Sequence, residues 1–246
     1  MRNPSDQTQR RTPIAILVNG PSSSGKSTLC RALQDRLIDI ADGNPDVVFA
    51  RVAFDDLVLM MSDKLFPISF VQLQSGDLSR LVSRSPFDGR AGWEYVDDSN
   101  SIGQHGGSPR VRIDLSPHVR QLLHGLHRSW AAHLELGTNL IIDHFIQDSS
   151  WCDEVVNMLK GSGARIVVVG VRCSLVELER RESSRADGKV EGRPLGLARR
   201  SDELCHAHPL AYDITVHTDQ EPTAQSVESI VTAMQARGLI APATSR

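Results

Sequence analysis

Short apolar runs alternate along the chain with longer segments in which apolar residues recur every three or four positions. The runs predict buried β-strands over residues 14–18, 47–53, 139–143, 164–171 and 214–217. Helical spacing predicts α-helices over residues 26–40, 57–61, 117–136, 150–159, 175–185, 195–205 and 222–237. Strands that alternate with helices in this way predict an α/β fold of three layers, with a five-stranded parallel sheet between two layers of helices.

Residues 66–114 interrupt this alternation, because they are rich in Gly, Ser, Asp and Arg. Only residues 93–96 and 111–113 within them alternate like the two strands of a hairpin. A structureless loop of this length is uncommon inside a compact domain, so the segment is interpreted as an inserted functional flap, with a partly disordered segment as the alternative. One main domain is expected over residues 13–240, with the flap inserted in it. Residues 1–12 are expected to form a mobile tail before this domain, and residues 241–246 a second tail after it.

The stretch GPSSSGKS at residues 20–27 matches the phosphate-loop pattern G-x-x-x-x-G-K-[ST] without a mismatch. It follows a predicted strand and opens a predicted helix, which is the context that this motif requires. Glycines permit the tight loop, inward backbone N–H groups form an anion site, and the helix dipole adds positive potential. The motif therefore predicts that ATP is bound by Gly20, Pro21, Ser22, Ser23, Ser24, Gly25, Lys26, Ser27 and Thr28.

Two side chains of this loop have separate expected roles. Lys26 is expected to reach the β- and γ-phosphates, and the Ser27 hydroxyl is expected to be a ligand of Mg²⁺. The alternative interpretation, a serine- and glycine-rich surface loop, does not account for the strand and helix on either side.

Asp55 and Asp143 each lie at the end of a predicted strand, as Arg172 does. The carboxyl ends of parallel strands meet at one edge of a sheet, so these side chains are expected near the phosphate loop. Asp55 is interpreted as the base that accepts a proton from an attacking hydroxyl, and Asp143 as a direct or water-mediated metal ligand. The alternatives are structural, since Asp55 or Asp56 could cap a short helix and Asp143 could belong to a turn. His144 is interpreted as a packing or substrate contact, because no second His or Cys stands at ligand spacing.

Arg180, Arg181 and Arg185 lie on one predicted helix, and Arg193 follows the glycine-containing loop after it. Arginines carried by a closing lid neutralise the charge of a transferring phosphoryl group. Arg181 and Arg185 share a helix face and are therefore candidate catalytic residues, with residues 187–199 as the lid. The alternative is a solvated helix face on which the arginines pair with Glu177, Glu179 and Glu182.

Charge and cysteine content limit the functional classes. The net charge of -3 does not indicate a general nucleic-acid or anionic-membrane binder. The four cysteines are widely spaced, which favours a reducing cytoplasm over a disulfide framework or a zinc site. His206 and His208 are interpreted as surface or substrate-site residues rather than zinc ligands. No apolar segment is long enough for a signal peptide or a membrane span, and the sequence is compatible with a homo-oligomer.

Several longer stretches resemble the chloramphenicol phosphotransferases. They are NGPSSSGKS, VAFDDL, GWEYVDD, LIIDHF, VGVRCSLVELERRESSRADGKVEG and HPLAYDITVHTD, and the resemblance covers most of residues 14–237. It implies a fold like that of the nucleoside monophosphate kinases and the transfer of the γ-phosphoryl group of ATP to a hydroxyl group. In the activity for which the family is named, this hydroxyl is the primary alcohol of an antibiotic. Carried over by position, it implies that Asp55 is the base, that Lys26 and Ser27 are the phosphate-loop lysine and serine, and that Arg181 and Arg185 lie near the lid arginines.

The chain also departs from the family pattern in three places. Pro21 stands where the family usually has Gly, His144 replaces an aspartate, and residues 66–110 form a longer segment. The kinase chemistry is unaffected by these differences, whereas the acceptor is left open.

The sequence thus predicts a cytoplasmic phosphate-loop kinase that uses ATP and Mg²⁺ and phosphorylates a small-molecule alcohol. Chloramphenicol or another antibiotic is the expected acceptor, with antibiotic resistance as the expected role. One alternative is a kinase of a nucleoside, nucleotide or nucleotide sugar, similar to zeta-type toxins. The other is a nucleotide-binding regulatory module with a protein partner and no phosphoryl acceptor.

Overall fold

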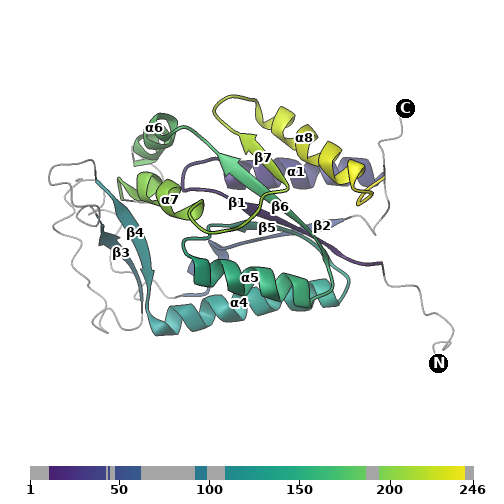
Figure 1. The fold of residues 1–246 in the computed structure, drawn as a ribbon, viewed down its shortest axis with the longest axis horizontal. Coiled ribbons are helices and arrows are strands. Elements are labelled where there is room, and N and C mark those ends of the chain that lie inside the picture. The colour runs from purple at the N-terminus through teal and green to yellow at the C-terminus, as the bar shows by residue number, and fades with distance from the viewer. Residues whose placement is uncertain are drawn as a thin grey trace.

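The computed structural model describes residues 11–42, 44, 48–61, 92–98, 109–186 and 194–241. Figure 1 shows a central sheet with helices on both sides and a separate hairpin at one end. Most of the predicted first tail, the larger part of the predicted flap and the first seven residues of the predicted lid lie outside these ranges. Those parts of the domain organisation therefore stay predictions.

Five parallel strands form the central sheet, in the order β2-β5-β1-β6-β7. They are β1 (Ile14–Asn19), β2 (Phe49–Ala53), β5 (Asn139–His144), β6 (Arg165–Arg172) and β7 (Ile214–His217). The predicted five-stranded parallel sheet is confirmed. β1 lies in the middle of the sheet and all six of its residues are buried, because helices cover both faces. Its carboxyl end thus opens at the edge of the sheet where ligands of α/β proteins bind.

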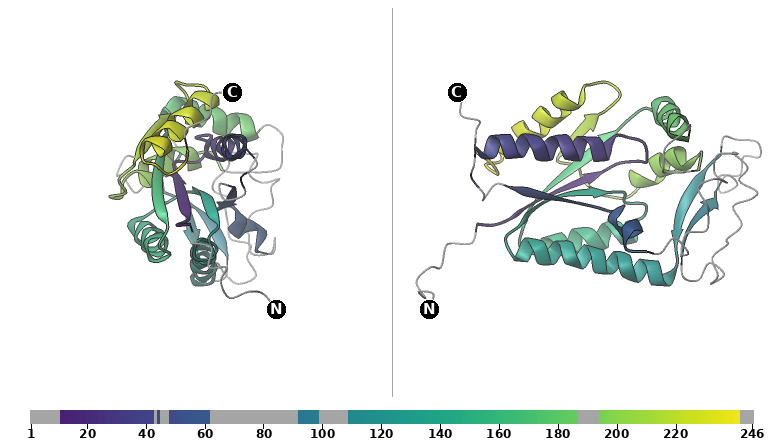
Figure 2. Two further views of the ribbon diagram at one scale, coloured as in Figure 1. Left: turned by 90° about the vertical axis from the view of Figure 1, so that its right-hand side faces the viewer. Right: turned by 180° about the vertical axis from the view of Figure 1, so that it is seen from behind.

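Pairs of helices cover the two faces of the sheet (Figure 2). One face carries α1 (Lys26–Ala41) and α8 (Thr223–Ala236), and the other carries α4 (Pro117–Glu135) and α5 (Ser149–Gly161). Leu29, Leu33 and Leu37 recur every fourth residue on α1 and are buried in the core shared with α8. A second core beneath α4 and α5 contains Trp130 and Trp151. The predicted arrangement of three layers is confirmed.

The predicted hairpin is also confirmed, as the antiparallel pair β3 (Trp93–Asp97) and β4 (Val111–Leu115). Val111, Ile113 and Leu115 alternate with polar residues and are buried in the core beneath α4 and α5. This packing attaches the hairpin to the domain. At the start of α4, the Ser116 hydroxyl accepts a hydrogen bond from the backbone N–H of Val119 at 3.3 Å and so caps the helix.

Three further helices are α2 (Asp56–Leu59), α6 (Leu175–Ala186) and α7 (Leu197–Cys205). The prediction that α7 begins at residue 195 is wrong by two residues, because Gly196 at its N-terminus has a φ of 95°, outside the helical region. Within the described ranges, no helix has both the length and the apolar character needed to cross a membrane.

Candidate active site

The phosphate loop connects β1 to α1 at the centre of the sheet edge. Gly25 has a φ of 85° and Ser23 a φ of 64°, so the chain turns sharply before α1 begins. A Cβ on Gly20 would lie only 2.6 Å from the backbone oxygen of Val171 on β6. Glycine at position 20 therefore lets the loop pass close to the neighbouring strand.

Lys26 is the first residue of α1, and its side chain folds back over the loop. Its Nζ donates a hydrogen bond to the backbone oxygen of Pro21 at 3.0 Å. The ammonium group therefore lies beside the loop amides and the positive end of α1. This arrangement concentrates positive potential at one point and suits a polyphosphate.

Three hydrogen bonds to distant parts of the sequence hold the loop and the end of β1 in place. The Ser201 hydroxyl accepts from the backbone N–H of Ser22 at 2.9 Å, and the Thr218 hydroxyl donates to the backbone oxygen of Ser24 at 2.6 Å. Asn19, fully buried, donates to the backbone oxygen of Cys205 at 2.8 Å. No local pattern indicated the role of Ser201, whereas Thr218 follows directly after a predicted strand.

Asp143 and Asp55 occupy the same edge of the sheet as the loop. Asp143 on β5 is buried and pairs in register with Val18 of β1 and with Ala53 of β2. Phe54 donates its backbone N–H to the Asp143 backbone oxygen at 2.8 Å, which places Asp55 one residue further along this edge. The parallel sheet therefore brings together the two carboxylates and the loop, as the strand-end pattern indicated.

The structure distinguishes the two adjacent aspartates after β2. The Asp56 carboxylate accepts from the backbone N–H of Ala53 at 2.7 Å and so stabilises the turn. Asp55 is exposed, occupies the N-cap position of α2 and makes no side-chain cap hydrogen bond. Asp56 therefore has the structural role, and the catalytic role of Asp55 stays a prediction.

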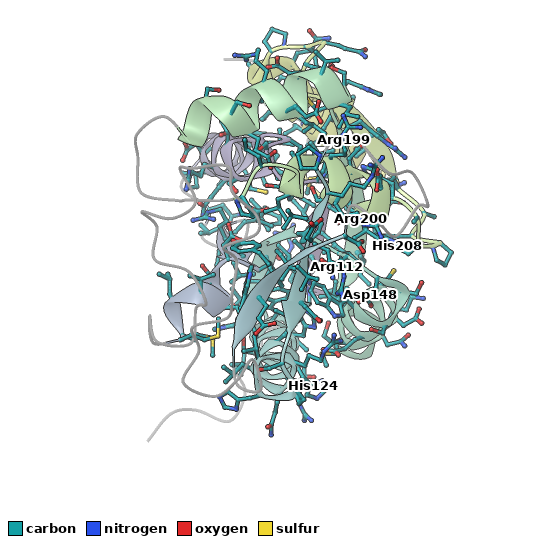
Figure 3. All side chains as sticks on the ribbon, turned by 90° about the vertical axis from the view of Figure 1, so that its left-hand side faces the viewer. Arg112, His124, Asp148, Arg199, Arg200 and His208 are labelled. Carbon is teal, nitrogen blue, oxygen red and sulfur yellow. The ribbon has the colours of Figure 1, made fainter. Side chains whose placement is uncertain are left out.

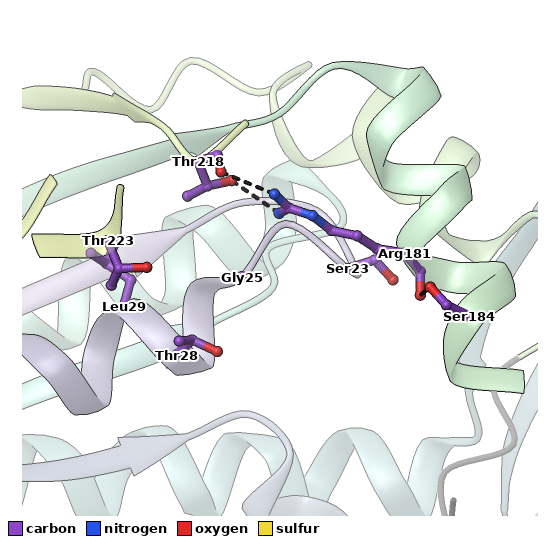
Figure 4. A pocket seen from close by; sticks show the side chains of 8 residues that line it. All are labelled: Ser23, Gly25, Thr28, Leu29, Arg181, Ser184, Thr218 and Thr223. Carbon is purple, nitrogen blue, oxygen red and sulfur yellow. Dashed lines mark hydrogen bonds between the residues drawn. The ribbon is translucent and has the colours of Figure 1, made fainter. Parts of the chain in front are cut away.

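A pocket of about 370 Å³ lies beside the loop (Figure 4). Arg181 of α6 extends across it, donating to the backbone oxygen of Thr218 at 2.9 Å and to the Glu177 carboxylate at 2.7 Å. Hydrogen bonds from Arg180 and Arg181 lower the pKa of Glu177 to about 2. The side chains that line the pocket are those of Ser23, Thr28, Leu29, Arg181, Ser184, Thr218 and Thr223, together with Gly25.

The other predicted lid arginines have different outcomes. Arg180 is exposed and pairs with Glu177 at 2.6 Å, as the solvated-face alternative expected. Arg185 belongs to α6, but the position of its side chain is not described. Residues 187–193 of the lid, which include Arg193, lie outside the described ranges. Of the lid arginines, the structure therefore brings only Arg181 to the pocket within its described part.

Two buried histidines, His127 and His144, form structural hydrogen bonds. His144 is fully buried, its Nε2 lies 2.8 Å from the Nε2 of His127, and the Nδ1 of His127 lies 2.6 Å from a Glu154 carboxylate oxygen. Burial holds the pKa values of His127 and His144 below the ordinary range, and their mutual repulsion adds to the effect at His144. Of the two roles expected for His144, packing is confirmed, and a contact to the substrate stays a prediction. No cluster suitable for a metal ion is formed by His, Cys, Asp and Glu among the described residues.

His206 and His208 follow α7, and of the two roles expected for them, at the surface or at the substrate site, the surface role is wrong for His208. That side chain is 7% exposed, and its Nε2 lies 3.2 Å from the backbone oxygen of Ile146. His206 is partly buried, with its Nδ1 2.7 Å from the Tyr212 hydroxyl. The chain folds back over this segment after α7, which no local pattern indicated.

Solved structures resemble this fold over nearly the whole chain. A sugar kinase from Janibacter sp. HTCC2649 has a TM-score of 0.52 at 14% identity, covering 96% of this chain and 99% of that one. The APS kinase of Mycobacterium tuberculosis, in complex with AMPPNP and APS, has a TM-score of 0.53 at 12% identity, covering 91% and 98%. At these identities the likeness shows the fold alone, which is that of the phosphate-loop kinases.

Sequence comparison gives a narrower result. A proposed O-phosphotransferase of Mycobacterium tuberculosis, in strains CDC 1551 and H37Rv, is 27% identical over 221 residues, which are 90% of this chain and 82% of the relative. The family model described as chloramphenicol phosphotransferase-like protein matches residues 14–235. The loop, both strand-end aspartates and Arg181 all lie within the matched range. The chain therefore belongs to the chloramphenicol phosphotransferase-like protein family.

Proposed function

We propose that this protein transfers the γ-phosphoryl group of ATP to a hydroxyl group of a small molecule. The observation that carries the proposal is the common edge of the sheet on which the phosphate loop and the Asp55 carboxylate lie. A loop for polyphosphate beside an exposed carboxylate suits transfer to a hydroxyl, because such a group can accept the proton that the nucleophile loses.

In this proposal the loop binds the phosphates of ATP. The backbone N–H groups near the start of α1 and the Lys26 ammonium contact the phosphate oxygens. The pocket crossed by Arg181 supports the proposal, since it adjoins Gly25 and provides space next to the loop. From this position the Arg181 guanidinium stabilises negative charge on the nucleotide during transfer.

The chemistry of two oxygen donors suits Mg²⁺. Mg²⁺ prefers hard oxygen ligands and keeps several waters, so one hydroxyl and one carboxylate are sufficient protein ligands beside the phosphates. The Ser27 hydroxyl at the start of α1 and the Asp143 carboxylate at the end of β5 provide this set. Asp143 is buried and in register with Val18, two residues before Gly20, so it lies at the same edge of the sheet as the loop. When bound, the ion would neutralise charge on the phosphate oxygens.

Asp55 then acts on the acceptor. The acceptor oxygen attacks the γ-phosphorus, the bond from that phosphorus to the bridging oxygen breaks, and ADP leaves with the electron pair. The Asp55 carboxylate accepts the acceptor's hydroxyl proton and later releases it to water. The products are the phosphorylated alcohol, ADP and one proton.

The hairpin borders the proposed acceptor site. The Trp93 ring of β3 lies 5.4 Å from the ring of Phe54, the residue before Asp55. Residues 66–114, predicted as a flap, therefore end in a hairpin that packs next to the proposed base. This position supports an acceptor that contacts the hairpin, and we propose chloramphenicol or another hydroxylated antibiotic as the first candidate.

A mass-spectrometric screen tests the proposal. The full chain is incubated with ATP, Mg²⁺ and a panel of hydroxylated antibiotics, nucleosides and nucleotide sugars, and a gain of one phosphoryl group is measured. Lys26→Ala is the blank. Asp55→Asn should abolish transfer while ADP still binds, and Asp56→Asn is the matched control, because an amide oxygen can still accept from Ala53.

The outcomes separate the hypotheses. Normal transfer by Asp55→Asn would refute the assignment of the base. Phosphorylation of a nucleoside or nucleotide sugar alone would replace the proposed acceptor class and keep the mechanism. If chloramphenicol is phosphorylated, expression of the chain should raise the antibiotic concentration that a bacterial host tolerates, which tests the proposed cytoplasmic role in resistance.

A further inference from the structure

Helix α7 contacts the phosphate loop, the arginine-bearing helix α6 and the hairpin β3–β4. We propose that α7 is a positioning element that holds the loop in its nucleotide-binding shape and couples it to the hairpin, with Ser201 as the contact to the loop and Arg200 as the contact to the hairpin. The inference rests on the proposed function in one respect, namely that the loop binds a nucleotide.

The contact to the loop is a buried hydrogen-bond pair. The Ser201 side chain is 1% exposed, accepts from the backbone N–H of Ser22 at 2.9 Å and donates to the backbone oxygen of Ala198 at 2.9 Å. A buried backbone N–H requires a partner, so the Ser22 N–H is directed toward α7. Ser201 thereby fixes the orientation of the first half of the loop, while the second half enters α1.

The contact to α6 fixes the start of α7. Glu182 is 5% exposed, and its two carboxylate oxygens accept from the backbone N–H groups of Gly196 and Ala198 at 2.8 and 2.6 Å. A carboxylate at this position satisfies free N–H groups and complements the positive end of the helix. Since Glu182 follows Arg181 in the chain, α7 and the arginine of the pocket are held together.

The contact to the hairpin involves a set of ion pairs. Arg200 donates to Asp98, which directly follows β3, at 2.5 Å and to Glu203 at 3.0 Å, and Arg110 before β4 donates to Glu203 at 2.8 Å. The backbone N–H of Val111 also donates to the backbone oxygen of Gly196 at 3.1 Å. These contacts bind the β3-to-β4 connecting end of the hairpin to α7. Figure 3 looks onto this face, with Arg199 and Arg200 on α7 above Arg112 of the hairpin.

A displacement of the hairpin must therefore displace α7 or break this set of contacts, and a displacement of α7 changes the partner of Ser22. The opposite strand end of the hairpin, at Trp93, packs on Phe54 beside the proposed base. Coupling between two binding sites is reciprocal, so a nucleotide bound at the loop must affect the hairpin as strongly as the hairpin affects the nucleotide. The inference can thus be tested with a nucleotide alone.

The first experiment measures the affinity of the full chain for ADP with Mg²⁺ by titration calorimetry. Ser201→Ala should raise the dissociation constant about tenfold, because it leaves a buried loop N–H without its partner. Ser201→Thr, which keeps the hydroxyl, should restore much of the affinity. Ser183→Ala is the matched control, since that hydroxyl on α6 is exposed and donates to the backbone oxygen of Glu179 within its own helix.

The second experiment measures backbone hydrogen exchange in β3 and β4 with and without ADP. ADP should slow exchange in the wild type and in Arg199→Gln, because Arg199 pairs with Glu179 of α6 rather than with the hairpin. The protection should be lost in Arg200→Gln, which removes the ion pair to Asp98. This readout does not depend on Ser201→Ala being folded.

The results distinguish two failures. Absence of ADP binding by the wild type would overturn both the proposed function and this inference. Wild-type affinity in folded Ser201→Ala, or equal protection of the hairpin in Arg200→Gln and Arg199→Gln, would overturn the inference and leave the proposed function in place.

Discussion

His206 should make the protein sensitive to mild acid. Burial, followed by repulsion from Arg172, His208 and Lys26, lowers the pKa of His206 to about 4. Its Nδ1 lies 2.7 Å from the Tyr212 hydroxyl, and its buried Nε2 has no hydrogen-bond partner among the described residues. The doubly protonated imidazolium would therefore place a charge in this site while its Nε2–H lacks a hydrogen-bond acceptor.

The size of the effect follows from the two pKa values. An unfolded histidine titrates near 6.5, the reference from which the folded value falls to about 4. Below pH 6.5 the unfolded chain binds the proton more readily than the folded chain, so stability falls with pH until the folded group also titrates. At about 1.36 kcal/mol per pKa unit, the full shift would correspond to roughly 2 kcal/mol between pH 7 and pH 5. Because the imidazole is only partly buried, solvent screening reduces the expected loss to about 1 kcal/mol.

The perturbation is His206→Asn, whose amide can keep the hydrogen bond to Tyr212 and carries no proton-binding site in this range. Urea unfolding followed by tryptophan fluorescence at pH 7 and pH 5 gives the free energy of unfolding, since the three tryptophans are all buried. The wild type should lose about 1 kcal/mol more than the variant between the two pH values. His118→Asn is the control, because His118 is exposed on α4.

The change in the free energy of unfolding between pH 7 and pH 5 is compared between the wild type and the variant. The contribution of the carboxylates to this change is the same in both proteins and therefore cancels. If the variant loses as much stability as the wild type between pH 7 and pH 5, the reasoning from the burial of His206 is refuted.

Four further predictions concern packing, helix propensity, capping and the metal. Gly170→Ala should destabilise the protein by about 1–3 kcal/mol in urea unfolding, because the new Cβ would lie 2.6 Å from the Tyr212 ring. In contrast, Gly125→Ala on the exposed face of α4 should stabilise the protein by roughly 0.5–1 kcal/mol, since no atom lies within 4 Å of the new Cβ. Glu182→Ala should cost about 2–4 kcal/mol, because two buried N–H groups at the start of α7 lose their acceptor, and a loss below 1 kcal/mol would contradict the capping role. Chelation of Mg²⁺ should abolish phosphoryl transfer and its re-addition should restore it, whereas transfer that persists in excess chelator would contradict the roles of Ser27 and Asp143.

Much of the site was predictable because its signals are local. The loop from Gly20 to Ser27 is a contiguous pattern, and Asp143 and Asp55 follow apolar runs whose carboxyl ends must meet in a parallel sheet. The helix boundary at residue 197 was less predictable, because a distant segment leaves room only for glycine at the left-handed position 196, where a Cβ would lie 2.5 Å from the backbone oxygen of Pro109.

The buried polar contacts were not predictable from local signals. His144 and His127 come from different elements, and their hydrogen bond depends on how α4 packs against β5. His208 lies in a segment whose composition is typical of a protein surface, but the chain after α7 folds against Ile146 and buries the His208 side chain.

By itself, the sequence determined the order of strands and helices, the α/β class and the phosphate loop, since periodicity and short motifs depend on neighbouring residues. Only the tertiary structure decided what holds the loop. Ser201 reaches Ser22 across 179 residues of chain, and Thr218 reaches Ser24 across 194. Such contacts depend on the path of the whole backbone and on which helix packs beside which strand. For the same reason, the role of α7 between the loop and the hairpin became visible only in three dimensions.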